Sequence, residues 1–182
     1  MRATQQLAAE HRVIEEVLAA LDRVVADAER TRVVPVTFLK QLVTFSRSFV
    51  DQCHHGKEER CFFPCLVKRG VPAEGGPIQV MLREHEEGRR LVGVIEDTLV
   101  RHEDGRAALD DVLGACRDYV DLLRTHIEKE SQVLFRLGDA VMGDDDEAGT
   151  GQCFADMDAA LGAGAHGLAE GLCAAVEGGE RP

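Results

Sequence analysis

Apolar residues recur at three- and four-residue spacing along most of the chain, and this periodicity predicts amphipathic helices. Strand-like alternation of apolar and polar residues is scarce. We therefore predict an all-α fold. The clearest stripe runs through Leu109, Val112, Cys116, Tyr119, Leu123, His126, Glu130, Val133 and Leu137.

Prolines, glycines and capping residues divide the first 140 residues into four long helical segments. Gly76-Pro77 opens the third of them, because proline suits a first helical position. At about 1.5 Å per residue each segment spans roughly 35 to 50 Å, which predicts an up-and-down four-helix bundle over residues 1–140. The predicted helices cover about residues 4–30, 37–70, 77–103 and 106–137.

The pattern changes in residues 141–182. The acidic run Asp144-Asp145-Asp146-Glu147, followed by Gly149-Thr150-Gly151, predicts a solvated loop without the alternating oxygen ligands of a calcium site. The segment from Phe154 to Val176 is rich in alanine and glycine. It predicts one short additional helix at the C-terminal side, packed on the bundle.

Charge and composition exclude several classes of protein. The chain has 33 acidic and 21 basic residues and a formal net charge of −12, which opposes binding to nucleic acid. No apolar run approaches the roughly 20 residues that a membrane-spanning helix needs. The chain begins with an amphipathic pattern and not with a signal-type apolar segment, so we expect it to be cytoplasmic.

The six cysteines form no CxxC pair, and most occupy apolar positions of helical patterns. In a cytoplasmic chain this predicts free thiols that act as small core residues. The alternative is a redox or soft-metal pair made by Cys61 and Cys65, which are four residues apart on one predicted helix face.

A histidine interrupts the core stripe of every predicted long helix, and two of the stripes also contain a glutamate. One such histidine usually reflects a satisfied core side chain, but burying unpaired carboxylates costs several kcal/mol and calls for a cation. Each glutamate follows a histidine by four residues, so both side chains share one helix face about 6 Å apart. These interrupting residues are His11, His54 with Glu58, His85, and His126 with Glu130.

An internal repeat supports a two-metal site. A Glu-His pair begins each half of the predicted bundle, at Glu10-His11 and at Glu84-His85, and a His-x-x-x-Glu motif follows each pair at a similar distance. Two such hairpins packed about a pseudo-twofold axis bring both motifs to that axis. Imidazole and carboxylate ligands suit iron, manganese or zinc, and a two-metal arrangement favours iron.

These motifs resemble the hemerythrin-like, HHE-type cation-binding domain, and the resemblance covers about residues 4 to 137. It rests on Glu10-His11, His54-His55-Gly56-Lys57-Glu58-Glu59, Glu84-His85-Glu86 and the segment from His126 to Glu130. The resemblance implies two non-haem iron ions with a bridging oxide or hydroxide inside a four-helix bundle. It implies that one iron is held by His11 and His54, the other by His85 and His126, with Glu58 and Glu130 bridging them.

The chain departs from the animal respiratory proteins of that family at Met81, where those proteins have a second histidine. We expect His55 to replace it as a ligand of the second iron, the alternative being a surface or supporting histidine. Whether Glu58 or Glu59 bridges stays open from spacing alone, although the match between the two halves favours Glu58. With five histidines, two bridging glutamates and one bridging oxide, two irons that each prefer about six ligands retain about one open position.

Other residues near these motifs have two interpretations each. Glu10, Glu84 and Glu86 either hold the far ring nitrogens of the ligand histidines or are solvated. Tyr119, which lies on the stripe of His126, either donates a hydrogen bond to a bound ligand or fills the core.

The resemblance implies that dioxygen or a related ligand, such as peroxide or nitric oxide, occupies the open position. Our leading prediction is reversible dioxygen binding for sensing, storage or delivery. The alternatives are a di-iron catalase or peroxidase acting on hydrogen peroxide, and an iron- or nitric-oxide-responsive repair factor. A ferritin-like oxidase ranks lower, because that type uses Glu-x-x-His, the reverse order and a shorter step. The sequence identifies no protein partner.

Overall fold

The computed structural model describes residues 1–161 and 164–177, and these residues form helices and no strand. The all-α prediction is therefore confirmed. In chain order the helices are α1 (Ala3–Thr31), α2 (Val36–Phe45), the π-helical segments η1 (Ser46–His55) and η2 (Glu58–Phe62), α3 (Phe63–Lys68), α4 (Pro77–Glu103), α5 (Leu109–Gln132), α6 (Leu134–Val141), α7 (Asp144–Leu161) and α8 (Gly164–Glu177).

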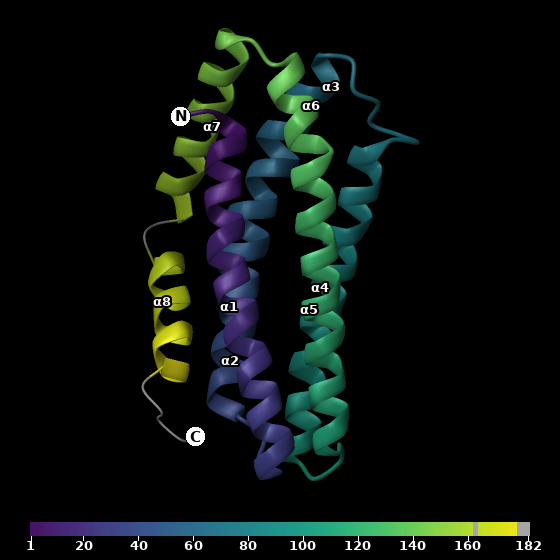
Figure 1. The fold of residues 1–182 in the computed structure, drawn as a ribbon, viewed down its shortest axis with the longest axis vertical. Coiled ribbons are helices and arrows are strands. Elements are labelled where there is room, and N and C mark those ends of the chain that lie inside the picture. Colours follow the sequence, from purple (N-terminus) through teal and green to yellow (C-terminus); the bar gives the residue numbers. More distant parts are fainter. Residues whose placement is uncertain (162–163, 178–182) are drawn as a thin grey trace.

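Four long helical rods lie side by side (Figure 1). They are α1, the chain of elements from α2 through η1 and η2 to α3, α4, and α5 continued by α6. Helix α5 packs against both α1 and α4, and α2 packs against α4. Each rod therefore turns an apolar stripe toward the others, as its periodicity predicts.

The second rod differs from the single α-helix that the sequence predicts, because it contains the π-helical segments η1 and η2. A π-helix has a wider turn than an α-helix and is typical of functional sites. The wider turn changes which side chains face inward, so that the consecutive residues His54 and His55 are both buried.

The prediction of an acidic loop followed by one short helix is wrong. Asp144–Glu147 forms the first turn of α7, where acidic side chains interact favourably with the positive end of the helix dipole. Asp146 also accepts hydrogen bonds from the Gly143 backbone N–H at 3.0 Å and from Arg69 at 2.7 Å. Helix α8 packs against α1 and α2, and Figure 1 shows both extra helices along one side of the rods. The division of the chain at residues 140 and 141 stays a prediction.

One pair of cysteines contradicts the prediction of free thiols. Cys61 of η2 and Cys153 of α7 form a disulfide, with their Cα atoms 6.0 Å apart. Cys61 thus pairs with a cysteine from a helix that the sequence pattern did not predict, and not with Cys65. Cys53, Cys65 and Cys116 carry free thiols.

The apolar core consists of two clusters. The larger cluster includes Ile14, Val50, Leu91 and Ile127, one from each rod. The smaller cluster again takes residues from each rod: Leu7, Phe62, Met81 and Leu134. Each rod therefore passes from one cluster to the other through a short interval, and the predicted site residues lie in these intervals, except His126, which lies at the end of the larger cluster beside Ile127. Within the described residues, none of the helices has both the length and the apolar character needed to cross a lipid bilayer.

Candidate metal centre

All seven predicted site residues are buried between the two apolar clusters and meet in two groups. Within each group the possible ligand atoms all lie within 4.8 Å of one another. Glu58 belongs to both groups, so the two groups share one carboxylate. The first group is His11, His54, Glu58 and Glu130, and the second is His55, Glu58, His85 and His126.

The carboxylate of Glu58 lies between one histidine of each group. Its Oε1 atom is 3.1 Å from His54 Nε2, and its Oε2 atom is 3.3 Å from His85 Nε2. Glu59 instead turns outward, where it accepts a hydrogen bond from His85 Nδ1 at 2.8 Å. In this geometry Glu58, and not Glu59, occupies the position that a bridging ligand requires.

Glu130 lies in the equivalent position on the opposite rod. Its Oε2 atom is 3.3 Å from His11 Nε2 and 3.7 Å from His126 Nε2. Glu130 and Glu58 are both fully buried. Each carboxylate therefore spans a histidine from one group and a histidine from the other, as expected from the internal repeat.

His55 joins the second group and is not a surface residue. Its ring stacks on His85 with 3.8 Å between the centroids, and it meets His126 edge-on at 5.7 Å. Met81, four residues before His85, is buried in the smaller apolar cluster. His55 thus supplies the third imidazole of this group from the neighbouring rod.

The inward-facing polar atoms have no hydrogen-bond partner among the described residues. Nearly all buried polar atoms in proteins have partners, and each one without a partner costs about 1 to 3 kcal/mol. A compact set of unpaired imidazole nitrogens and carboxylate oxygens therefore fits the binding of two cations. These atoms are Nε2 of His11, His54, His85 and His126 and both carboxylate oxygens of Glu58 and Glu130.

An outer layer of carboxylates faces the opposite ring nitrogens of four of the histidines. A carboxylate that accepts from Nδ1–H keeps Nε2 free as a metal ligand and fixes the orientation of the ring. Three of these contacts are hydrogen bonds at Nδ1: His54 to Glu10 at 3.0 Å, His126 to Glu84 at 3.1 Å and His85 to Glu59 at 2.8 Å. His55 Nδ1 lies 3.8 Å from Asp51, beyond hydrogen-bond distance, and has no hydrogen-bond partner among the described residues.

The sequence identified only part of this layer. It singled out Glu10 and Glu84, but each carboxylate holds a histidine on a neighbouring rod and not the one beside it in the chain. Glu86 is exposed. Asp51 was missed, and Glu59 was weighed only as the alternative to Glu58. Both lie four residues from His55 in the sequence, and this spacing gives no signal of which ring each one reaches.

Basic side chains lie behind these carboxylates. Lys57 contacts Glu10, Lys129 contacts Glu84, and Arg89 donates to both Asp51 and Glu59 at 2.7 Å. Burial opposes the ionisation of Glu10, but hydrogen bonds from His54 and Lys57 hold the pKa of Glu10 below its usual value. Glu10 therefore favours its charged form while it holds the His54 ring.

The two central carboxylates differ in protonation when no cation is present. Burial raises the pKa of Glu58, but His54 and His85 outweigh it and leave that pKa well below its usual value. Burial and the nearby charge of Glu58 raise the pKa of Glu130 well above its usual value. In the metal-free centre Glu130 thus keeps its proton to a higher pH than Glu58 does, and a bound cation would replace that proton.

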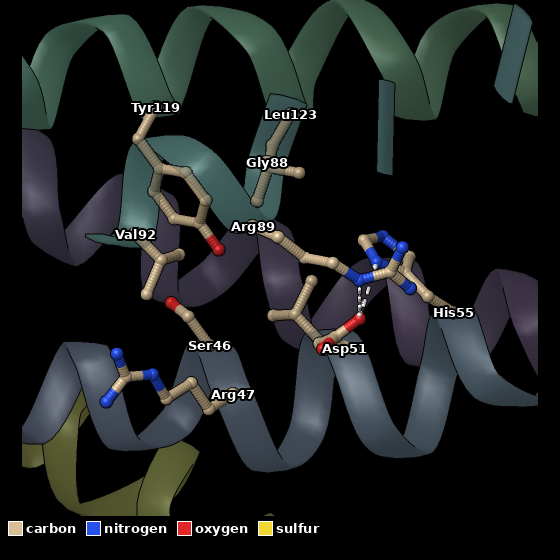
Figure 2. A pocket seen from close by; sticks show the side chains of 10 residues that line it. Ser46, Arg47, Asp51, His55, Gly88, Arg89, Val92, Tyr119 and Leu123 are labelled. Carbon is tan, nitrogen blue, oxygen red and sulfur yellow. Dashed lines mark hydrogen bonds and ion pairs between the residues drawn. The ribbon is translucent and has the colours of Figure 1, made fainter. Parts of the chain in front are cut away.

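A cavity of about 250 Å³ reaches His55 from the side of η1, α4 and α5. In Figure 2 the hydroxyl groups of Tyr119 and Ser46 point into it, while Asp51 and Arg89 lie at the end nearest His55. Tyr119 is buried in the larger apolar cluster. Its hydroxyl faces Ser46 and not the histidines, which favours the core interpretation of this tyrosine.

Comparison with known proteins agrees with this geometry. The model of the hemerythrin HHE cation-binding domain matches residues 2–137, which is more than half of the chain. The chain belongs to the hemerythrin HHE cation-binding domain family.

Among curated proteins, the iron-sulfur cluster repair protein YtfE of Enterobacter sp. (strain 638) is 33% identical over 86 residues, covering 45% of this chain and 39% of that protein. The YtfE proteins of Escherichia coli (strain K12 / DH10B) and Shigella boydii serotype 18 (strain CDC 3083-94 / BS512) match to the same extent. The chain therefore spans about two fifths of the length of these relatives. No solved structure matches the chain.

Proposed function

We propose that the chain is a non-haem di-iron protein of hemerythrin type that binds dioxygen reversibly. The observation that carries this proposal is the position of Glu58 and Glu130, each between a histidine of one group and a histidine of the other. In the proposed centre Glu58 and Glu130, together with an oxide or hydroxide, would hold the two irons between the two groups of histidines. The terminal ligands are His11 and His54 on one iron and His55, His85 and His126 on the other.

The iron pair supplies the ligand position and the electrons for oxygen binding. The surrounding side chains determine what reaches that position. Phe135 stacks on His11 with 5.2 Å between ring centroids, and Phe63 stacks on His85 at 5.9 Å. Both phenylalanines are buried in the smaller apolar cluster. These rings keep bulk water away from the imidazoles, which favours release of a bound ligand over its reduction.

The two groups differ in their number of imidazoles. The first group has two histidines and the second has three. If each iron prefers about six ligands, the first iron has the open position. We therefore expect the small ligand to lie beside His11 and His54, next to Phe135.

Repair of iron-sulfur clusters is the second candidate function, and it is supported by the name of the YtfE relatives. Because the match covers only 39% of the length of that relative, we give repair activity to this chain as a proposal. In this function the centre would give up iron or bind nitric oxide in place of dioxygen. The cytoplasmic location likewise stays a prediction.

One preparation separates these functions. The protein is loaded with ferrous iron without oxygen, exposed to air and then flushed with argon while the visible spectrum is recorded. An absorption band that appears in air and disappears under argon supports reversible dioxygen binding. Transfer of iron to a metal-free iron-sulfur acceptor supports repair, and rapid oxygen release from added hydrogen peroxide supports a catalase. A protein that takes up no more iron than its Glu58→Ala, Glu130→Ala double variant contradicts all three.

A further inference from the structure

Lys57 is a charged residue with almost no access to solvent, since only 1% of its side chain is exposed. Lysine is almost never fully buried in proteins without a partner. Its Nζ atom lies between two carboxylates, those of Glu10 and Asp158, with 2.6 Å to Asp158 Oδ1. Lys57 therefore acts as a fixed cation between two segments that are distant in the sequence.

Asp158 belongs to α7, which lies beyond residues 2–137 that the family model matches. Several contacts hold α7 on the rods independently of Asp158. The Cys61–Cys153 disulfide joins it to η2, Phe154 is fully buried, and Glu147 accepts a hydrogen bond from the Ala3 backbone N–H at 2.8 Å. Asp158 follows Phe154 by four residues, so both lie on the face of α7 that meets the rods.

These contacts form a continuous series from α7 to the candidate metal centre. Asp158 contacts Lys57, Lys57 contacts Glu10, and Glu10 lies 3.0 Å from His54 Nδ1. His54 Nε2 faces the first group. The equivalent series at His126 is shorter, because Lys129 contacts Glu84 and is 41% exposed. Among the described residues, α7 thus reaches only the first group by such a series.

We propose that Asp158 is a positioning residue for the iron held by the first group. It fixes Lys57 against Glu10, and Glu10 in turn holds the ring of His54. Helix α7 is then a functional part of the centre and not only a cover on the rods. This inference rests on the proposed function, and it assigns to α7 control over how firmly one of the two irons is retained.

The size of the effect follows from the place of Asp158 in the series. Replacing groups that hold a metal-ligating histidine typically changes metal affinity by about 10- to 100-fold. Asp158 is 42% exposed and acts through Lys57 and Glu10. We therefore expect the affinity for this iron to fall by about 10-fold, near the lower limit of that range.

The test compares Asp158→Asn with two other variants of α7. Asp158→Glu keeps the charge, and Asp156→Asn removes an exposed carboxylate that contacts only Gln152 of the same helix among the described residues. The first readout is the rate at which a ferrous chelator removes each iron. We expect Asp158→Asn to release one iron about 10-fold faster and the other at the wild-type rate. Asp158→Glu restores the slow rate, and Asp156→Asn behaves as the wild type.

A second readout uses the metal-free protein, so that the inference is separable from the proposed function. Nuclear magnetic resonance of the histidine rings follows solvent exchange of the His54 Nδ1 proton. We expect faster exchange in Asp158→Asn than in Asp156→Asn, with His126 unchanged. Equal exchange at His54 in these two variants overturns the inference even if the wild type binds two irons. A wild type that binds no iron, with faster exchange at His54 in Asp158→Asn, overturns the proposed function and leaves the positioning of His54 by α7 standing.

A folding defect is detected separately. If Asp158→Asn lowers the melting temperature, Lys57→Gln serves as the second variant. It removes the cation, while α7 keeps its disulfide and its buried Phe154. We expect this variant to speed the release of the same iron by at least as much as Asp158→Asn. Wild-type release rates in Lys57→Gln contradict the inference.

Discussion

Arg89 Nε donates a hydrogen bond to Asp51 Oδ1 at 2.7 Å, at the end of the cavity nearest His55 (Figure 2). The same guanidinium donates to Glu59 at 2.7 Å. Asp51 and Glu59 face the Nδ1 atoms of two histidines of the second group. One arginine on α4 therefore holds two carboxylates beside this group, of which Glu59 makes the hydrogen bond that orients the His85 ring.

Arg89→Met should weaken iron binding by the second group. Asp51 and Glu59 lose their shared cation, so Glu59 no longer holds the His85 ring in a fixed orientation. We expect a loss of affinity of about 10- to 100-fold for one iron, measured by competition with a chelator. Arg90→Met is the matched control, because Arg90 is exposed and pairs with Glu87 on the same helix. Equal affinities in the two variants contradict this role of Arg89.

Removing the two central carboxylates should have unequal effects on iron content. Glu58 lies in both ligand groups, with 3.1 and 3.3 Å to its two histidines, whereas Glu130 lies in the first group and reaches His126 of the second group at a longer 3.7 Å. We expect Glu58→Ala to lose both irons and Glu130→Ala to retain most of one, measured as iron per chain after desalting. Glu86→Ala, at an exposed position, should keep the wild-type content. Retention of both irons by Glu58→Ala excludes a shared carboxylate at this position.

The i to i+4 spacing placed both glutamates on the correct helix faces, so the inner residues could be found from the sequence. Which outer carboxylate holds which ring depends on how neighbouring rods pack, and spacing within one helix carries no such information. Glu10, for example, is next to His11 in the sequence, but in the structure it contacts His54. The acidic and glycine-rich start of α7 lacks an apolar stripe, so the sequence predicts a loop there and does not place Cys153 in a helix.

The metal-free protein should become less stable as the pH rises. Burial and the charge of Glu58 raise the pKa of Glu130 well above the ordinary value of 4.5. The folded state therefore binds this proton more tightly than the unfolded state, and the free energy of unfolding falls above pH 4.5 until the raised pKa is passed. The lowered pKa of Glu58 acts oppositely, and its contribution is lost only as the pH falls below that ordinary value.

Glu130→Gln isolates this effect, because the amide has no proton to lose. In urea unfolding of the metal-free proteins, we compare the free energy of unfolding of the variant with that of the wild type. We expect the difference to shift by about 1 to 3 kcal/mol in favour of the variant as the pH rises from acidic to mildly alkaline values. Glu128→Gln, at an exposed position on the same helix, should follow the wild type. Parallel pH profiles for wild type and Glu130→Gln would show that Glu130 carries no raised pKa.

The disulfide should stabilise the protein by joining distant segments. Cys61 and Cys153 are 92 residues apart, and a crosslink of this span raises the free energy of the unfolded chain by about 4.6 kcal/mol. We expect Cys153→Ser to lower the free energy of unfolding by up to about this amount under oxidising conditions. With a thiol reductant the difference from wild type should disappear. Cys65→Ser, which removes a free thiol, is the control. If all six cysteines of the unreduced, denatured protein react with a thiol reagent, the protein has no disulfide and this prediction is contradicted.

The central claim is that two irons share the carboxylates of Glu58 and Glu130. X-ray absorption spectroscopy of the iron-loaded protein measures it most directly, because it detects an iron neighbour as well as the nitrogen and oxygen ligands. We expect two irons per chain, an iron–iron distance of about 3.5 to 4 Å and a ligand set of imidazole nitrogen and oxygen. Iron bound without an iron neighbour, or with sulfur ligands, contradicts the account.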